Sequence, residues 1–296
     1  MTFNEGGQFE GGRVRKGGGR RGAVAVGGGG GVALVIALVY MLVTGNSPQD
    51  ILGGTTSGGG DTGEAGYIGQ CTAEQANTDQ ECRLNAAVQS LDAYWATALP
   101  EQGGVEYQMP EVVSFTDAVD TGCGSATSAT GPFYCPADTT VYEDLAFYDQ
   151  LSSQFGAEGG PLAEMYVTAH EFGHHIENQL GLFERADRSG TGPESDSVRI
   201  ELMADCLAGM WAGTAATTED PDTGVPFLEP IERAELEQAL SAAAAVGDDN
   251  IQRRSGGDVN PEAFSHGSSE QRVKWFSIGY NGGTIQDCNA LDASSL

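Results

Sequence analysis

The chain has 296 residues, of which 42 are acidic and 14 basic, so its formal net charge is −28. This length suits one sizeable domain with appendages. So acidic a surface repels nucleic acid and anionic lipid, and we therefore expect no nucleic-acid partner and attribute the acidity mainly to solubility.

The N-terminal part of the chain predicts a membrane anchor. Residues 1–21 are basic and rich in glycine, whereas residues 22–45 carry no charge and include the apolar run VALVIALVYMLV at 32–43. A bilayer span needs about 20 residues. Because flanking positive charge stays cytoplasmic, we expect a cytoplasmic tail at 1–21, a single transmembrane anchor at 22–45 and an extracytoplasmic domain at the cell membrane.

Two other interpretations of this region compete with the anchor. A cleaved signal peptide also has a basic region followed by a short apolar core, but the sequence TGNSPQD after the core offers no good cleavage site, so we favour a retained anchor. Export follows either way. A phosphate loop or nucleic-acid arm is disfavoured, because no Gly-Lys-Ser or Gly-Lys-Thr follows the glycines at 27–31.

The remaining sequence predicts an α+β fold dominated by helices. Residues 46–66 are rich in Gly, Ser and Thr, as in a flexible linker, so we expect the folded domain at 67–296. Hydrophobic spacing and turn residues predict helices near 74–99, 145–155, 161–180, 194–212, 231–246 and 268–280, and short strands at 112–116 and 133–142.

Six cysteines suggest disulfides, because their number is even and the region is expected to be exported. They are Cys71, Cys82, Cys123, Cys135, Cys206 and Cys288. Sequence alone does not decide among their pairings. Proximity favours Cys71 with Cys82 and Cys123 with Cys135, which leaves Cys206 for Cys288; free buried thiols are the alternative.

Residues 170–174 read HEFGH, which matches the HExxH pattern of zinc peptidases. Positions four apart lie on one helix face, so His170 and His174 can direct ring nitrogens at one Zn²⁺ ion. Glu171 lies beside them without being a ligand, as a general base for peptide hydrolysis requires. Pro161 suits the start of this helix and Gly181 its end.

A catalytic zinc ion takes three protein ligands, and the segment IELMADCLAG offers the third. Glu201 and Asp205 are four apart on a predicted helix among apolar neighbours, where unpaired carboxylates are costly. We assign Glu201 to the metal, and Asp205 to a hydrogen bond with the far nitrogen of one histidine ligand. The alternative is that both are ordinary surface acids.

The other two histidines have different expected roles. His175 points about 100° away from His174, so we interpret it as structural or surface. His266 lies in the polar segment SHGSSEQR, where its imidazole could donate to the oxyanion of a tetrahedral intermediate. A helix-capping or surface histidine is the alternative, and Tyr166 and Tyr280 are further candidates for the same catalytic role.

Four segments, VTAHEFGHHIENQLG, ELMADCLAG, FYCPADTTVYEDL and HGSSEQRVKWFSIGY, together resemble the bacterial putative neutral zinc metallopeptidase family. The resemblance covers nearly the whole chain. It implies a zincin-like fold in which a small β-sheet packs on the HExxH helix and a second helix brings the third ligand. In that pattern His170, Glu171, His174, Glu201 and Asp205 occupy the matching positions.

These observations predict a membrane-anchored zinc metallopeptidase with a peptide or protein substrate. The alternative from another class is a zinc-stabilised binding or chaperone-like module that cleaves nothing; a cytosolic metal sensor would need reduced cysteines and a buried apolar stretch. The sequence predicts neither the physiological substrate nor the oligomeric state.

Overall fold

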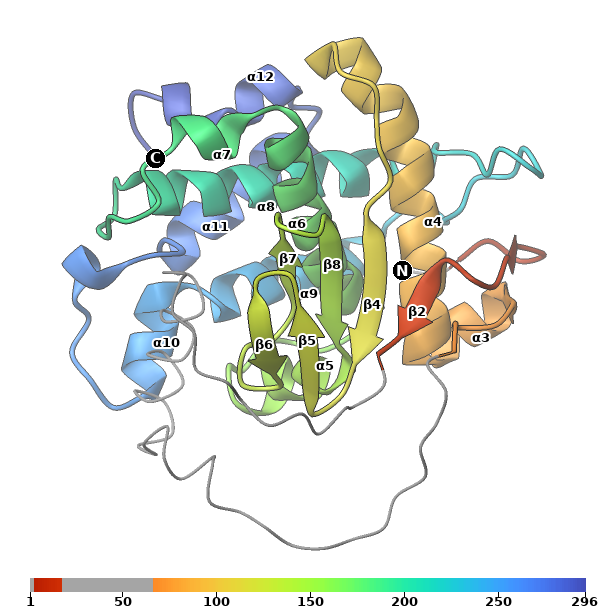
Figure 1. Ribbon diagram of the computed structural model, residues 1–296, viewed down its shortest axis with the longest axis horizontal. Coiled ribbons are helices and arrows are strands. Elements are labelled where there is room, and N and C mark those ends of the chain that lie inside the picture. Colours follow the sequence, from red (N-terminus) through yellow and green to blue (C-terminus); the bar gives the residue numbers. More distant parts are fainter. Residues whose placement is uncertain (1–2, 18–65) are drawn as a thin grey trace, which may run out of the picture.

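The structure, a computed structural model, describes residues 3–17 and 66–296 (Figure 1). Its regular elements confirm the α+β class with a majority of helix. The longer helices are α4 (Gln80–Ala98), α5 (Leu145–Ser153), α6 (Pro161–Gln179), α8 (Asp196–Thr214), α9 (Arg233–Ala245) and α11 (Ser269–Tyr280). The shorter ones are α3 (Ala73–Thr78), η1 (Leu99–Gly103), α7 (Leu182–Arg185), α10 (Asp248–Arg254), η2 (Pro261–Ala263), α12 (Ile285–Cys288) and η3 (Ala290–Asp292).

The main sheet has four strands in the order β2-β4-β8-β7. They are β2 (Val14–Lys16), β4 (Glu111–Phe115), β8 (Thr140–Asp144) and β7 (Phe133–Cys135). The first three run parallel and β7 is antiparallel to β8. A two-stranded sheet joins β1 (Gln8–Phe9) to β3 (Cys71–Thr72), and a hairpin joins β5 (Ala118–Thr121) to β6 (Gly124–Thr127). This hairpin lies between the two predicted strands, at 112–116 and 133–142, in a region for which the sequence predicted no strand.

The N-terminal segment is part of the fold. In Figure 1 the red strand β2 lies beside the yellow β4, with Val14 opposite Val112. Phe3, Phe9 and Val14 are buried in the core. The backbone N–H of Lys16 donates to the carbonyl of Gly66 at 2.7 Å, so these two residues lie side by side although they are 50 positions apart in the sequence.

This arrangement overturns the predicted localisation. The expected anchor at 22–45 lies outside the described residues, as do the boundaries placed at its ends. Within 3–17 and 66–296, no helix is long and apolar enough to cross a membrane. A single crossing between β2 and β4 would put these strands on opposite sides of the bilayer, yet they pair in one sheet. The predicted single-pass topology, with a cytoplasmic N-terminus and an extracytoplasmic domain, is therefore wrong.

Two of the basic residues that suggested that topology, Arg13 and Lys16, form ion pairs within the fold. Arg13 Nε lies 2.6 Å from Asp92 Oδ2, and Lys16 Nζ lies 2.5 Å from Glu81 Oε2. Both acids lie on α4, which packs beside β2. The positive charge thus complements this acidic helix, and the sequence by itself gave no sign of that long-range pairing.

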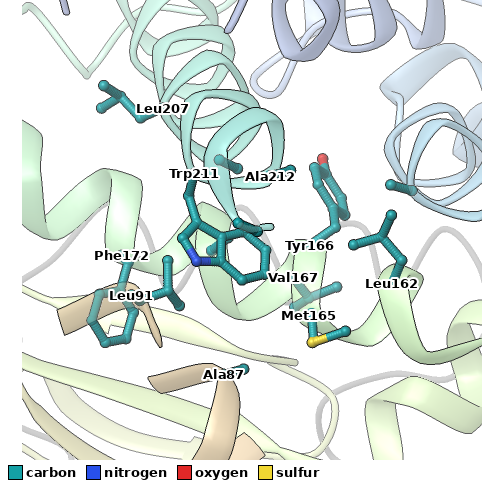
Figure 2. Packing of buried hydrophobic residues seen from close by; sticks show 14 of the residues in the cluster. Ala87, Leu91, Leu162, Met165, Tyr166, Val167, Phe172, Leu207, Trp211 and Ala212 are labelled. Atoms are coloured by element: carbon teal, nitrogen blue, oxygen red, sulfur yellow. The ribbon is translucent and has the colours of Figure 1, made fainter. Parts of the chain in front are cut away.

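The core fixes α6 against α8. Trp211 of α8 is fully buried among Leu91 of α4 and Val167 and Phe172 of α6, as Figure 2 shows. Its indole N–H donates to Ser90 at 3.1 Å. A Cβ at Gly173 would lie 2.8 Å from the backbone of Ala204, so glycine within the HEFGH motif allows the two helices to approach closely.

Three disulfides join the six cysteines in the pairing that proximity favoured: Cys71–Cys82, Cys123–Cys135 and Cys206–Cys288. The first ties β3 to α4, and the second ties the β5–β6 hairpin to the edge strand β7. The third ties α8 to α12 near the C-terminus, at the residue that follows Asp205.

Candidate metal centre

The motif helix α6 carries both histidines on one face. The centroids of the His170 and His174 rings lie 4.7 Å apart. Pro161 occupies the first turn of the helix, and Gly181 follows its C-cap with a φ of 69°, a left-handed conformation suited to glycine. The expected helix boundaries and the shared face of the two histidines are therefore confirmed.

The carboxylate of Glu201, from α8, faces both imidazoles. Its Oε2 lies 3.2 Å from His170 Nε2, and its Oε1 lies 3.6 Å from His174 Nε2. The three donor atoms lie within 4.8 Å of one another. Tetrahedral coordination with bonds near 2.1 Å separates ligand atoms by about 3.4 Å. These residues therefore fit a single metal ion, and the fold brings together all three ligands predicted from the sequence.

The charge around these donors also suits a divalent cation. Glu171, Glu177 and Asp205 are buried near His170, and the guanidinium of Arg272 pairs with Asp205. Burial alone would raise the pKa of Glu201, but His266 and His174 lower it well below its usual value. A buried carboxylate that stays charged needs a cation beside it, so Glu201 is suited to bind a metal ion.

Each histidine has a carboxylate at its far nitrogen. His170 Nδ1 lies 2.9 Å from Asp205 Oδ1, and His174 Nδ1 lies 2.8 Å from Glu177 Oε2. With Nδ1–H donating to a carboxylate, each ring keeps the lone pair of Nε2 for a metal. The sequence predicted Asp205 in this position but missed Glu177, which its place three residues after His174 on the same helix could have revealed.

Glu171 lies beside the ligands but is not among the three donors that converge. Its side chain is buried, with 7% of the residue exposed. Burial raises the pKa of Glu171, and the neighbouring His170 and His174 oppose that shift. A carboxylate whose proton affinity is increased in this way suits a general base.

His266 reaches the centre from the loop before α11. Asp248 Oδ2 accepts the backbone N–H groups of Ser265, His266 and Gly267 at 2.7, 2.7 and 3.1 Å, while its Oδ1 lies 3.3 Å from His266 Nδ1. Burial would lower the pKa of His266, but Glu201 and Asp248 raise it to about 8. The imidazole is therefore held close to Glu201 with a net tendency to carry a proton.

The remaining candidates are engaged elsewhere. Tyr166 donates to Asp205 Oδ1 at 2.5 Å, which commits its hydroxyl to the support of His170. His175 is buried between Tyr134 and Gln108, and burial lowers its pKa to about 4, which agrees with a structural role. Tyr280 stacks on Phe276. Sequence reasoning also missed Arg272, whose buried guanidinium pairs with Asp205.

Two histidines on one helix, a glutamate beside them and a further glutamate from a second helix form a group that could hold one metal ion, an arrangement of the kind that metallohydrolases use. Comparison with known proteins agrees with this class. A model of the putative neutral zinc metallopeptidase family matches residues 4–291, and the chain belongs to that family.

The curated relatives are uncharacterized proteins. One from Mycobacterium tuberculosis strain H37Rv is 47% identical over 230 residues, which is 77% of each chain. The protein YpfJ of Escherichia coli K12 is 39% identical over 224 residues, 74% of each chain. No solved structure matches the chain significantly.

Proposed function

We propose that this protein hydrolyses peptide bonds, using a zinc ion held by His170, His174 and Glu201 and Glu171 as its general base. The observation that carries the proposal is that the carboxylate of Glu201 lies 3.2 Å from Nε2 of His170 and 3.6 Å from Nε2 of His174. Beside them is the buried Glu171, which is not one of the three metal donors. The family to which the chain belongs supports zinc as the metal.

A zinc ion bound here would polarise a carbonyl and lower the pKa of water towards about 7. Glu171 then removes the proton from the attacking water and passes it to the leaving amine. His266, held by Asp248, donates to the carbonyl oxygen as negative charge develops on it, a contact typically worth a few kcal/mol. The side chains of His170, His174 and Glu201 are 9 to 18% exposed, so the proposed zinc site is not sealed from solvent.

A zinc-stabilised binding module is the competing function. A structural zinc site is closed by four protein ligands, whereas the described residues bring three metal donors together at this centre. Glu171 also has no role in such a module. Both features favour catalysis.

The test is hydrolysis of a mixed peptide library by the zinc-loaded full-length protein and by its Glu171→Gln variant. We expect cleavage by the wild type, a loss of turnover of at least about 1000-fold in Glu171→Gln, and equal zinc content in both. Glu158→Gln, at an exposed position before α6, is the matched control and should retain activity. Full activity in Glu171→Gln would show that Glu171 is not the general base. No cleavage by the zinc-loaded wild type would favour the binding module.

A further inference from the structure

We propose that Arg272 is a positioning residue that sets the metal affinity of the centre, because it holds Asp205 as the acceptor of the His170 Nδ1–H. Arg272 lies on α11, 67 residues after Asp205 and 102 after His170. The inference rests on the metal site of the proposed function, though not on its catalytic step.

The contact between Arg272 and Asp205 is bidentate. Arg272 Nε donates to Asp205 Oδ2 at 2.8 Å, and its Nη2 donates to Oδ1 at 2.9 Å. Only 3% of Arg272 is exposed, and Asp205 is fully buried. A planar guanidinium that binds both carboxylate oxygens fixes the plane of the carboxylate as well as its position.

That fixed plane matters because Asp205 Oδ1 also accepts from His170 Nδ1 at 2.9 Å and from Tyr166 at 2.5 Å. The direction of Oδ1 decides how the His170 ring lies, and so where its Nε2 points. Without Arg272, Asp205 would be a buried carboxylate without its permanent cation, which costs free energy unless the group rotates or takes up a proton. Either change weakens the support of His170.

The close packing of α11 on α8 makes this reach possible. A Cβ at Gly279 would overlap the carbonyl of Cys206, so the two helices approach backbone to backbone. Because of this packing, Arg272 reaches the carboxylate that supports His170, and the support of His174 is different. His174 is supported by Glu177 without a guanidinium in the described structure, and Glu177 Oε1 has no hydrogen-bond partner there. A change at Arg272 should therefore act on the His170 side of the centre.

Arg83 offers a matched control. It is also buried, with 6% of the residue exposed. Its Nη1 lies 2.6 Å from Oε2 of Glu164 on α6, the helix that carries His170 and His174. Both arginines are thus buried and pair with a carboxylate on a helix of the centre, but only Arg272 pairs with the carboxylate that supports His170.

The experiment measures zinc affinity by competition with a chelator in the full-length wild type, Arg272→Met, Arg272→Lys and Arg83→Met. We expect affinity to fall on the order of 10- to 100-fold in Arg272→Met, by less in Arg272→Lys, and not at all in Arg83→Met. The Arg272→Met and Asp205→Asn changes together should weaken zinc binding little more than either alone, since both break one link.

Proton NMR of the imidazole N–H region gives a second measure that a merely structural role would not move. The His170 Nδ1–H signal should shift or broaden in Arg272→Lys while that of His174 persists. Unchanged zinc affinity in a folded Arg272→Lys or Arg272→Met, or an equal loss in Arg83→Met, would overturn the inference. Because neither readout requires turnover, an inactive wild type with the expected affinity changes would count against the proposed peptidase function alone.

Discussion

His174 Nδ1 lies 2.8 Å from Oε2 of Glu177, a fully buried carboxylate one turn further along the motif helix. His174 thus has its supporting carboxylate on its own helix, α6, whereas the carboxylate that supports His170, Asp205, comes from α8. The difference between a local and a long-range support leads to the first prediction.

Glu177→Gln should weaken zinc binding on the order of 10-fold. An amide that accepts from His174 Nδ1–H lacks the charge that strengthens that hydrogen bond. Chelator competition on the full-length protein measures the affinity, and Gln179→Glu, an exchange on the same helix at a residue near His175, serves as the control. Wild-type affinity in a folded Glu177→Gln would show that this carboxylate does not support the ligand.

Glu143 should make the stability of the metal-free protein depend on pH. It is fully buried on β8 and accepts from the Tyr148 hydroxyl at 2.9 Å. Burial, and then the charge of Glu171, raise its pKa from 4.5 to about 8. The folded state therefore binds a proton more tightly than the unfolded state, and stability is lost as pH rises from about 4.5 to about 8.

Glu143→Gln stays neutral at every pH and can still accept from Tyr148. We expect it to be more stable than the wild type by a few kcal/mol near pH 8, with the difference vanishing towards pH 4.5. Urea unfolding in the presence of a chelator, at several pH values, measures this difference. Glu101→Gln, at an exposed position, is the control; a pH-independent effect of Glu143→Gln would contradict the prediction.

The N-terminal strand should be essential for folding. Deletion of residues 1–17 removes Phe3, Phe9 and Val14 from the core and leaves the edge of β4 unpaired. The apolar burial alone suggests a loss on the order of 5 kcal/mol, comparable with the stability of a whole domain. A chain that begins at residue 67 should therefore fold poorly.

The matched variant replaces residues 18–65 by a short Gly-Ser linker, since Lys16 and Gly66 are joined by a backbone hydrogen bond of 2.7 Å. We expect this variant to keep the thermal midpoint of the wild type within a few degrees. Thermal unfolding followed by circular dichroism compares the two. Equal stability of the deletion and the linker variant would argue against the contribution of β1 and β2.

Loss of the Cys206–Cys288 disulfide should reduce both stability and zinc affinity. This bond closes a separation of 82 residues, against 11 for Cys71–Cys82, so a double serine variant should lose about 4 kcal/mol, and the Cys71–Cys82 counterpart about 3 kcal/mol. Because Cys206 follows Asp205, only the first variant should also bind zinc less tightly. Equal zinc affinity in the two variants would show that the Cys206–Cys288 disulfide does not affect metal binding.

The local features of this protein could be predicted from its sequence. The HEFGH spacing places His170 and His174 on one face of a helix, Pro161 and Gly181 bound that helix, and the acids of IELMADCLAG follow on a second helix. Each of these features depends on the helical period of 3.6 residues or on a residue that favours a helix end. Residues close together in the sequence are enough to recognise either one. Proximity along the chain favoured two of the three disulfides, Cys71–Cys82 and Cys123–Cys135, and left Cys206 for Cys288, although the sequence alone did not decide the pairing.

The long-range contacts could not be predicted in this way. Three such contacts join residues that are 18 to 98 positions apart. They are the strand pairing of Val14 with Val112, the hydrogen bond from Arg272 to Asp205 and the hydrogen bond from the backbone of His266 to Asp248. Such contacts arise from the packing of whole elements, and a basic residue looks the same in a sequence whether it faces a membrane or an acidic helix. The position of a residue's partner depends on how the core is filled, which single-sequence patterns do not specify.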